Sequence, residues 1–205
     1  MKTLPKIVEK VELVKVIAKL DDKFPPPLGG EYTFVGRSNV GKSSLLNALV
    51  GRMVAFVSKN PGKTRTINYF LVNNNFYLVD LPGYGYARTS KKDREEWKKI
   101  IDRYFRERSW NMKVMFSLID SRHELVESDA QLLDWIQIIG VKPVVILTKI
   151  DKLSISEREK QLRYFENILL DYGIDRIIPC SSLTKEGLDK VWNVILEALN
   201  GGLKR

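Results

Sequence analysis

The sequence predicts an α/β fold in which a mostly parallel β-sheet carries helices on both faces. Three observations lead to this class. Short apolar runs, typical of buried strands, alternate along the chain with longer segments of helical periodicity. A glycine-rich loop at residues 36–43 joins a predicted strand to a predicted helix. The other polar motifs also follow directly after apolar runs, at the carboxyl ends of strands, where sheets of this class bind ligands.

The composition is that of a compact chain with a large positive charge. Of the 205 residues, 44% are hydrophobic and 29% charged, which suits one domain with a packed core. The net charge of +9 favours a polyanionic partner, either nucleic acid or a membrane surface. The single cysteine, Cys180, excludes an intramolecular disulfide, and the chain shows neither an apolar run long enough to span a membrane nor a signal peptide's apolar core. We expect a cytoplasmic protein, and we expect it to be a monomer.

The N-terminal part of the chain divides into an extension and the start of the main domain. Residues 1–30 are expected to form the extension, and residues 31–205 the domain. Within the extension, alternating charged and aliphatic positions predict a strand at 11–17, and the proline- and glycine-rich stretch 21–30 predicts a connector.

The glycine-rich loop lies between a predicted strand at 31–35 and a predicted helix at 43–50. Apolar runs at 67–72 and 76–79 then follow a polar loop. Three asparagines, residues 73–75, separate these two runs, which is the signal of a β-hairpin.

The rest of the chain continues the alternation of helices and strands. The predicted strands are the apolar runs 113–119, 143–147 and 176–179. One helix is expected to begin after Ser90, and the others to span 128–139, 156–172 and 185–199.

Several helices also carry end signals and an apolar face. Ser90 with Asp93 predicts an N-cap, and Ser156 with Glu159 predicts a capping box. Gly173 is expected to end the helix that this box begins. The apolar faces expected to point into the core consist of Trp97, Ile100, Ile101, Tyr104 and Phe105, and of Leu188, Val191, Trp192, Ile195 and Leu199.

The glycine-rich loop has the spacing of a phosphate-binding loop, G-x-x-x-x-G-K-[ST]. Gly36 and Gly41 allow a tight turn that brings backbone N–H groups against phosphate oxygens. Lys42 can reach the β- and γ-phosphates, and the Ser43 hydroxyl is placed to bind Mg²⁺. The alternative is a chance glycine-rich turn before a helix. The nucleotide contacts expected here are Gly36, Arg37, Ser38, Asn39, Val40, Gly41, Lys42, Ser43 and Ser44.

A second motif, D-x-x-G, ends the hairpin with Asp80, Leu81, Pro82 and Gly83. The Asp80 carboxylate can hold Mg²⁺ through water, because this ion prefers hard oxygens and keeps several waters. The Gly83 N–H can meet the γ-phosphate. Four residues of this form are weak evidence alone, but their place one hairpin after the phosphate loop makes them a strong signal.

A third motif, Thr148-Lys-Ile-Asp151, predicts which base the bound nucleotide carries. The Asp151 carboxylate can accept hydrogen bonds from N1–H and the exocyclic amine of guanine, whereas adenine would leave it unpaired, a discrimination of roughly 10⁴-fold or more. The stem of Lys149 can lie over the base, and a backbone N–H at Ser181 or Ser182 can reach guanine O6. A charged helix start is the alternative interpretation. The expected contacts are Thr148, Lys149, Asp151, Cys180, Ser181 and Ser182.

These motifs resemble those of the EngB family of bacterial GTPases, which is among the Ras-like, translation-factor-related GTPases. The resemblance covers nearly the whole chain and is carried by Gly-Arg-Ser-Asn-Val-Gly-Lys-Ser-Ser, Pro-Gly-Lys-Thr-Arg-Thr, Asp-Leu-Pro-Gly-Tyr-Gly-Tyr-Ala, Asp-Ser-Arg-His and Thr-Lys-Ile-Asp. It implies a three-layer, Ras-like G domain with a six-stranded sheet. It also implies binding of GTP and GDP, hydrolysis of GTP, and action in assembly of the large ribosomal subunit. A GTPase required for cell division or septation is an alternative.

The resemblance also assigns a switch loop. It implies that Thr64 meets Mg²⁺ together with Ser43 and Asp80, although spacing alone does not separate Thr64 from Thr66. The nucleotide contacts expected in this loop are Gly62, Lys63, Thr64, Arg65 and Thr66. The residues expected to act in hydrolysis are Asn39, Lys42, Thr64 and Gly83.

Three positions predict how the site departs from other GTPases. Tyr84 stands where many Ras-like proteins place a water-orienting glutamine, so we expect slow intrinsic hydrolysis; a plain surface aromatic is the alternative interpretation. Thr148 replaces the usual asparagine; its hydroxyl can still donate to guanine N7 but cannot make every contact of an amide. By resemblance to related GTPases, the Asn39 side chain is a candidate ligand for K⁺, the alternative being that it bonds its own backbone.

The basic excess is concentrated after the second switch loop. Residues 88–108 contain nine Lys or Arg and five Asp or Glu residues. We interpret this segment as an RNA-facing surface for the large ribosomal subunit or its precursor, whose geometry depends on GTP through residues 58–66 and 83–92. A solvated helix face is the alternative for many of these residues individually.

Two other functional classes share part of this pattern. A nucleotide-gated RNA-binding or ribosome-binding module that barely hydrolyses GTP would carry the same motifs. A metabolic phosphate-loop ATPase or kinase would share the glycine-rich loop, but the base motif ending in Asp151 argues against it.

Overall fold

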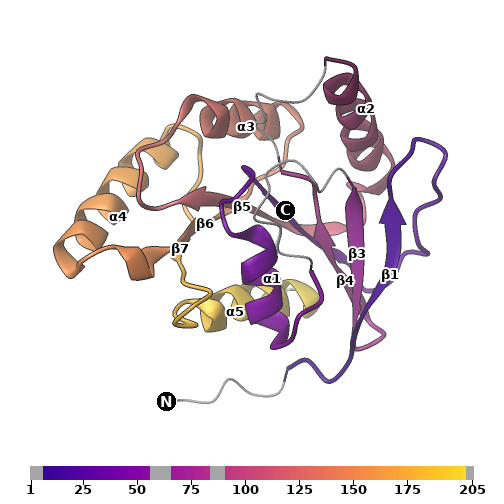
Figure 1. Cartoon of the computed structure of the whole chain (residues 1–205), viewed down its shortest axis with the longest axis horizontal. Helices are drawn as coiled ribbons and strands as arrows, with labels where there is room; N and C mark the ends of the chain where they lie inside the picture. Colours follow the sequence, from indigo (N-terminus) through magenta and orange to yellow (C-terminus); the bar gives the residue numbers. More distant parts are fainter. Residues whose placement is uncertain (1–6, 56–65, 84–90, 202–205) are drawn as a thin grey trace.

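The computed structural model describes residues 7–55, 66–83 and 91–201, with the side chains of residues 91–94, 96 and 97 excepted. Its centre is a seven-stranded sheet in the order β1-β3-β4-β2-β5-β6-β7 (Figure 1). The strands are β1 (Val11–Ile17), β2 (Glu31–Gly36), β3 (Ile67–Val72), β4 (Phe76–Asp80), β5 (Met112–Asp120), β6 (Val144–Thr148) and β7 (Ile177–Pro179). The helices are α1 (Lys42–Val50), α2 (Lys91–Arg108), α3 (Glu127–Ile138), α4 (Ile155–Leu170) and α5 (Leu188–Leu199), with a short 3₁₀ helix at Ile150–Lys152.

The sheet is mostly parallel, as predicted. β4, β2, β5, β6 and β7 pair in parallel, and β3 is antiparallel to both of its neighbours, β1 and β4. The expected number of six strands is wrong, because β1 adds a seventh at the edge. Val11 pairs with Val72 and Ile17 with Ile67, and both β1 residues are buried, so this part of the N-terminal segment is built into the sheet.

Two apolar cores lie on opposite faces of the sheet. Leu45 and Leu46 of α1 pack with Trp192 of α5 on one face. Residues from α2, α3 and α4, such as Tyr104 and Phe165, pack on the other face. Figure 1 shows the resulting three layers. In the described ranges, no helix is both long enough and apolar enough to cross a membrane.

The start of α4 differs from the prediction. The capping box consists of Ser154 and Glu157, and it precedes the predicted pair, Ser156 and Glu159. Glu157 N donates to Ser154 Oγ at 3.4 Å, and Ser154 N donates to the Glu157 carboxylate at 2.7 Å. Both pairs have the same spacing, so the spacing alone could not choose between them.

The start of α5 also differs, because the helix begins at Leu188 and not at residue 185. Lys185 and Gly187 both have positive φ angles, 65° and 78°, which a right-handed helix does not accept. A Cβ at Gly187 would lie only 2.2 Å from the Pro179 carbonyl oxygen. The tight turn after β7 therefore delays the helix and requires glycine directly before it.

The apolar face of α2 is confirmed where the structure describes it. Ile100, Ile101, Tyr104 and Phe105 are buried against the sheet. The predicted N-cap at Ser90 and the side chain of Trp97 lie outside the described residues.

A buried polar cluster, which the sequence did not predict, joins the C-terminal end of α2 to the sheet. The Glu31 carboxylate is fully buried and accepts hydrogen bonds from Arg108 Nε at 2.7 Å, Tyr104 Oη at 2.9 Å, Tyr69 Oη at 3.4 Å and Asn111 Nδ2 at 3.3 Å. Burial, together with the Glu31 charge, raises the pKa of Tyr104 well above its usual range. Glu31 begins β2, so this cluster lies at the end of the strand opposite the glycine-rich loop.

Candidate functional site

The glycine-rich loop connects β2 to α1 in a left-handed turn. Asn39 and Gly41 have φ angles of 63° and 109°. Gly41 stands at the N-cap position, and the first turn of α1 contains no acidic residue. The backbone N–H groups that open α1 therefore face no side-chain carboxylate of their own turn, which suits a bound anion.

The D-x-x-G motif packs directly against this loop. A Cβ at Gly83 would lie 3.1 Å from both the Cα and the N of Ser38. At Gly36, a Cβ would lie 2.9 Å from the Val40 side chain and 3.0 Å from the Leu118 carbonyl oxygen. The absence of a side chain at Gly83 thus allows the D-x-x-G motif to lie against the loop as the sequence predicted, and its absence at Gly36 allows the loop to pack on Val40 and Leu118.

Lys42 and Asp80 form a buried ion pair between the two motifs. The predicted roles of both side chains concern the same triphosphate, Lys42 on its oxygens and Asp80 on its Mg²⁺. The Lys42 ammonium and the Asp80 carboxylate therefore lie side by side where β4 ends next to the glycine-rich loop. Ser43 follows Lys42 in α1, and its hydroxyl and the Asp80 carboxylate are the hard oxygen donors that Mg²⁺ prefers.

Part of the predicted switch loop lies outside the described residues, namely Gly62, Lys63, Thr64 and Arg65. Tyr84 also lies outside them. Thr66 is described, and its hydroxyl donates to Asn68 Oδ1 at 3.0 Å.

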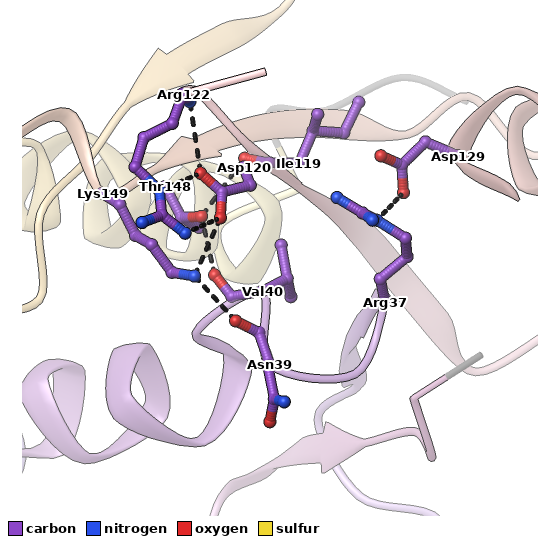
Figure 2. Close-up of polar contacts among 9 residues, drawn as sticks. All are labelled: Arg37, Asn39, Val40, Ile119, Asp120, Arg122, Asp129, Thr148 and Lys149. Atoms are coloured by element: carbon purple, nitrogen blue, oxygen red, sulfur yellow. Dashed lines mark hydrogen bonds and ion pairs between the residues drawn. The ribbon is translucent and has the colours of Figure 1, made fainter. Parts of the chain in front are cut away.

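The base motif is bound to the phosphate loop through two side chains. Thr148 Oγ1 contacts the Val40 carbonyl oxygen at 2.7 Å and the Ile119 carbonyl oxygen at 3.2 Å. Lys149 Nζ donates to the Asn39 carbonyl oxygen at 2.7 Å (Figure 2). The single hydroxyl hydrogen of Thr148 is therefore directed at the main chain, and donation to guanine N7 would require the hydroxyl to turn.

Asp151 is held as an ionised acceptor. Ser181 Oγ donates to Asp151 Oδ1 at 2.7 Å, and Lys152 Nζ lies 3.3 Å from Oδ2. The Ser181 hydrogen bond is the largest effect that lowers the pKa of this carboxyl. A carboxylate in this state offers acceptors only, as the reading of guanine N1–H and the amine requires.

The backbone N–H groups of residues 180–182 differ in whether they are already hydrogen-bonded within the protein. Cys180 is buried and its N–H donates to the Leu147 carbonyl oxygen, while burial raises the pKa of its thiol to about 12. The Ser181 N–H donates to the Glu186 carbonyl oxygen at 3.0 Å. Of the two N–H groups proposed for guanine O6, that of Ser181 is thus already bound within the turn, and Ser182 is the better candidate.

Three ion pairs next to the loop were not predicted. Arg37 Nε lies 3.1 Å from Oδ1 of Asp129, a buried residue of α3. Asp120, at the end of β5, binds both Arg122 and Lys149 (Figure 2). The Asp-Ser-Arg-His segment contributes to the sequence prediction only through a resemblance, and no local pattern signals a contact between loop and helix residues so far apart in sequence.

The basic segment separates into structural and exposed residues. Arg108 belongs to the Glu31 cluster, and Arg103 donates to the Leu20 and Asp22 carbonyl oxygens at 2.6 and 2.8 Å. Lys98, Lys99 and Arg106 are exposed, Arg106 to 74%. Arg88 and the side chains at 91, 92 and 94 lie outside the described part of the chain.

Comparison of the sequence with known families gives one model match, described as 50S ribosome-binding GTPase, over residues 31–149. A probable GTP-binding protein EngB of Thermosipho africanus is 52% identical over 92% of this chain and 96% of its own length. The probable GTP-binding protein EngB of Thermotoga maritima is 50% identical over the same shares of the two chains.

Solved structures match the fold. The crystal structure of a probable GTP-binding protein engB superposes with a TM-score of 0.66 at 21% identity, covering 83% of this chain and 99% of that chain. Era in complex with MgGDPNP and nucleotides 1506–1542 of 16S ribosomal RNA gives a TM-score of 0.66 at 25% identity, covering 82% of this chain and 56% of Era. These matches confirm the predicted Ras-like G-domain architecture.

Proposed function

The chain belongs to the EngB family of GTP-binding proteins, and from this premise we propose that it is a cytoplasmic, monomeric, GTP-hydrolysing switch in large-subunit assembly. The observation that supports guanine nucleotide as its ligand most strongly is the junction in Figure 2. There the base motif is hydrogen-bonded to the phosphate loop. Outside that view, Ser181 donates to the Asp151 carboxylate and lowers the pKa of this carboxyl. One nucleotide would be bound at both ends by one continuous network.

In the proposed mechanism the chain positions the nucleotide. Backbone N–H groups of the glycine-rich loop bind the phosphates, and Lys42 leaves Asp80 to contact the β- and γ-phosphates. Ser43, Thr64 and Asp80 would hold Mg²⁺, which supplies charge neutralisation at those phosphates when it is bound. The Gly83 N–H contacts the γ-phosphate, and the loss of this phosphate on hydrolysis releases the segment that leads into α2.

The Asn39 side chain is proposed as a ligand for K⁺. The Asn39 carbonyl oxygen accepts from Lys149, and Figure 2 shows the side-chain amide on the opposite side of the backbone. The amide oxygen is therefore directed away from the base motif. A cation at this point would offset charge that builds up between the phosphates during hydrolysis.

Hydrolysis is therefore expected to be faster in KCl than in NaCl, by up to about 10²-fold, since that is the scale of a removed electrostatic stabiliser. Turnover is measured at matched ionic strength, fixed Mg²⁺ and saturating GTP. In Asn39→Ala the two salts should give equal rates. Equal rates in the unmodified protein would exclude the cation role, and a K⁺ effect that survives in Asn39→Ala would exclude Asn39 as its ligand.

The partner is proposed to be RNA of the large ribosomal subunit or its precursor. Three observations support it: the net charge of +9, the exposed Lys98, Lys99 and Arg106 on α2, and the description of the matching family as 50S ribosome-binding. Era, a related GTPase, is described in complex with nucleotides 1506–1542 of 16S ribosomal RNA, which supports RNA as the class of partner and not the large subunit in particular. The α2 helix follows the second switch loop directly, so a change of bound nucleotide can alter the position of this surface.

Replacing Lys98, Lys99 and Arg106 with glutamine is expected to weaken binding to isolated large subunits and to leave GDP affinity unchanged. The slope of log affinity against log salt should fall by about two to three, because each phosphate that is no longer neutralised reduces it by about one. A matched triple variant, Lys160, Arg163 and Lys190 to glutamine, removes the same charge from exposed sites on α4 and α5. If both triple variants reduce the slope equally, the effect is one of net charge and the α2 surface does not bind the RNA.

A further inference from the structure

We infer that Asp120, oriented by Arg122, is a positioning residue that fixes the Lys149 ammonium and so sets how long a guanine nucleotide stays bound. The inference rests on the proposed binding of guanine nucleotides at this site. It assigns a role to two residues, Asp120 and Arg122, that lie outside both the phosphate loop and the base motif.

The geometry of Asp120 uses both of its carboxylate oxygens. Oδ1 accepts from Arg122 Nε at 2.9 Å and from Arg122 N at 3.2 Å. Oδ2 accepts from Arg122 Nη2 at 2.8 Å and from Lys149 Nζ at 2.8 Å. Arg122 thus holds the carboxylate as a planar fork, and only the remaining direction of Oδ2 is offered to Lys149 (Figure 2).

The position of Asp120 in the sheet explains why it reaches Lys149. Asp120 ends β5 and pairs with Thr148 at the end of β6, so Lys149 is the next residue across the sheet edge. Asp120 is buried, with 5% of its surface exposed, whereas the Lys149 side chain is 28% exposed. A rigid anion therefore orients the head of a long and partly solvated side chain.

Lys149 connects Asp120 to the proposed nucleotide site. Its ammonium also donates to the Asn39 carbonyl oxygen at 2.7 Å, so one nitrogen connects Asp120 to the phosphate loop. Lys149 also has a left-handed backbone, with φ of 63°, directly before the 3₁₀ helix that carries Asp151. Fixing Lys149 before the nucleotide arrives lowers the ordering cost of binding, which is the general effect of preorganisation.

The charges agree with this role. Burial raises the pKa of the Asp120 carboxyl, but the hydrogen bonds from Arg122 and Lys149 lower it by more. The pKa therefore lies well below the usual range of an aspartate, and the group is ionised at neutral pH. One anion between two cations leaves a net positive charge on the side that faces the loop. The arrangement therefore orients Lys149 without cancelling the charge that a nucleotide meets.

The test is the dissociation rate of a fluorescent GDP analogue from the full-length protein, in a double-mutant cycle of Asp120→Asn and Lys149→Met. Asp120→Asn is expected to speed dissociation about tenfold. In the Lys149→Met background the same change should have an effect below about twofold, because the residue it positions is gone. Asp175→Asn, which removes an exposed ion-paired carboxylate, is the matched control and should have no effect.

Arg122→Lys is an independent test, because it keeps the Asp120 carboxylate and the positive charge and removes only the bidentate hydrogen bonding by the guanidinium. It should speed dissociation of the GDP analogue about threefold. This variant serves if Asp120→Asn does not fold. An equal effect of Asp120→Asn in both backgrounds would show a structural role and overturn the inference, as would an unchanged rate in Asp120→Asn or Arg122→Lys. Failure of the proposed function would look different, since the unmodified protein would then not bind the GDP analogue.

Discussion

Replacing Asp151 with asparagine is expected to abolish the preference for guanine nucleotides and to favour xanthine nucleotides. The Asp151 carboxylate, held by Ser181 at 2.7 Å, offers two acceptors to guanine N1–H and the exocyclic amine. An asparagine amide keeps one acceptor and presents N–H groups, which match the oxygen that xanthine carries in place of the amine. The ratio of GDP to XDP affinity should shift by roughly 10⁴-fold, because a site built for one hydrogen-bonding pattern rejects the other.

The shift is measured by competition of GDP and XDP against a fluorescent nucleotide. Asp175→Asn is again the matched control, since it neutralises an aspartate that is also ion-paired but lies on the surface with Lys142. Thermal unfolding of both variants separates a change of preference from a loss of fold. Full guanine preference in Asp151→Asn would show that another group reads the base.

Replacing Arg108 with methionine is expected to destabilise the protein by about 3–5 kcal/mol, since it leaves a buried carboxylate without its cation. Glu31 is fully buried, and Arg108 contributes two of its hydrogen bonds. The loss is a large part of the roughly 5–15 kcal/mol that stabilises a typical domain. The free energy of unfolding is measured by urea denaturation.

Two further variants identify the cause of that loss. Arg106→Met removes an exposed arginine from the same helix and should change stability by less than about 0.5 kcal/mol. The double variant Glu31→Leu with Arg108→Met should recover part of the loss, because it removes the buried charge as well as its partner. A loss below about 1 kcal/mol in Arg108→Met would contradict the account of the cluster as a stabilising anchor of α2.

The geometry of the candidate site could be predicted where it depends on local spacing. Gly36, Gly41 and Lys42 lie in one loop, and Asp80 and Gly83 in one turn, so the type and order of residues carry the function. The alternation of strands and helices then brings these separate motifs to one edge of the sheet. The nearness of Gly83 to the phosphate loop follows from that rule alone.

Contacts between distant segments could not be predicted. The motifs assign Lys42 and Asp80 separate partners on the nucleotide, and only the fold shows that the two side chains meet each other. The charge runs of α2 do not reveal that Arg108 is buried against Glu31, since a helix face must be placed against its strand before a partner is defined. Likewise, the pattern of residues 11–17 predicts a strand but does not say which strand it pairs with, so its place as the seventh strand of the main sheet was missed.

We propose that the bound guanine nucleotide controls the affinity of this protein for the large ribosomal subunit. The measurement that tests it most directly is sedimentation of the full-length protein with isolated large subunits, in a non-hydrolysable GTP analogue, in GDP and without nucleotide. Small subunits and the Lys98, Lys99 and Arg106 triple variant are the controls. The account predicts that the protein sediments with large subunits in the GTP-analogue state and is released in GDP. An equal bound fraction in all three states, or equal binding to both subunits, would contradict it.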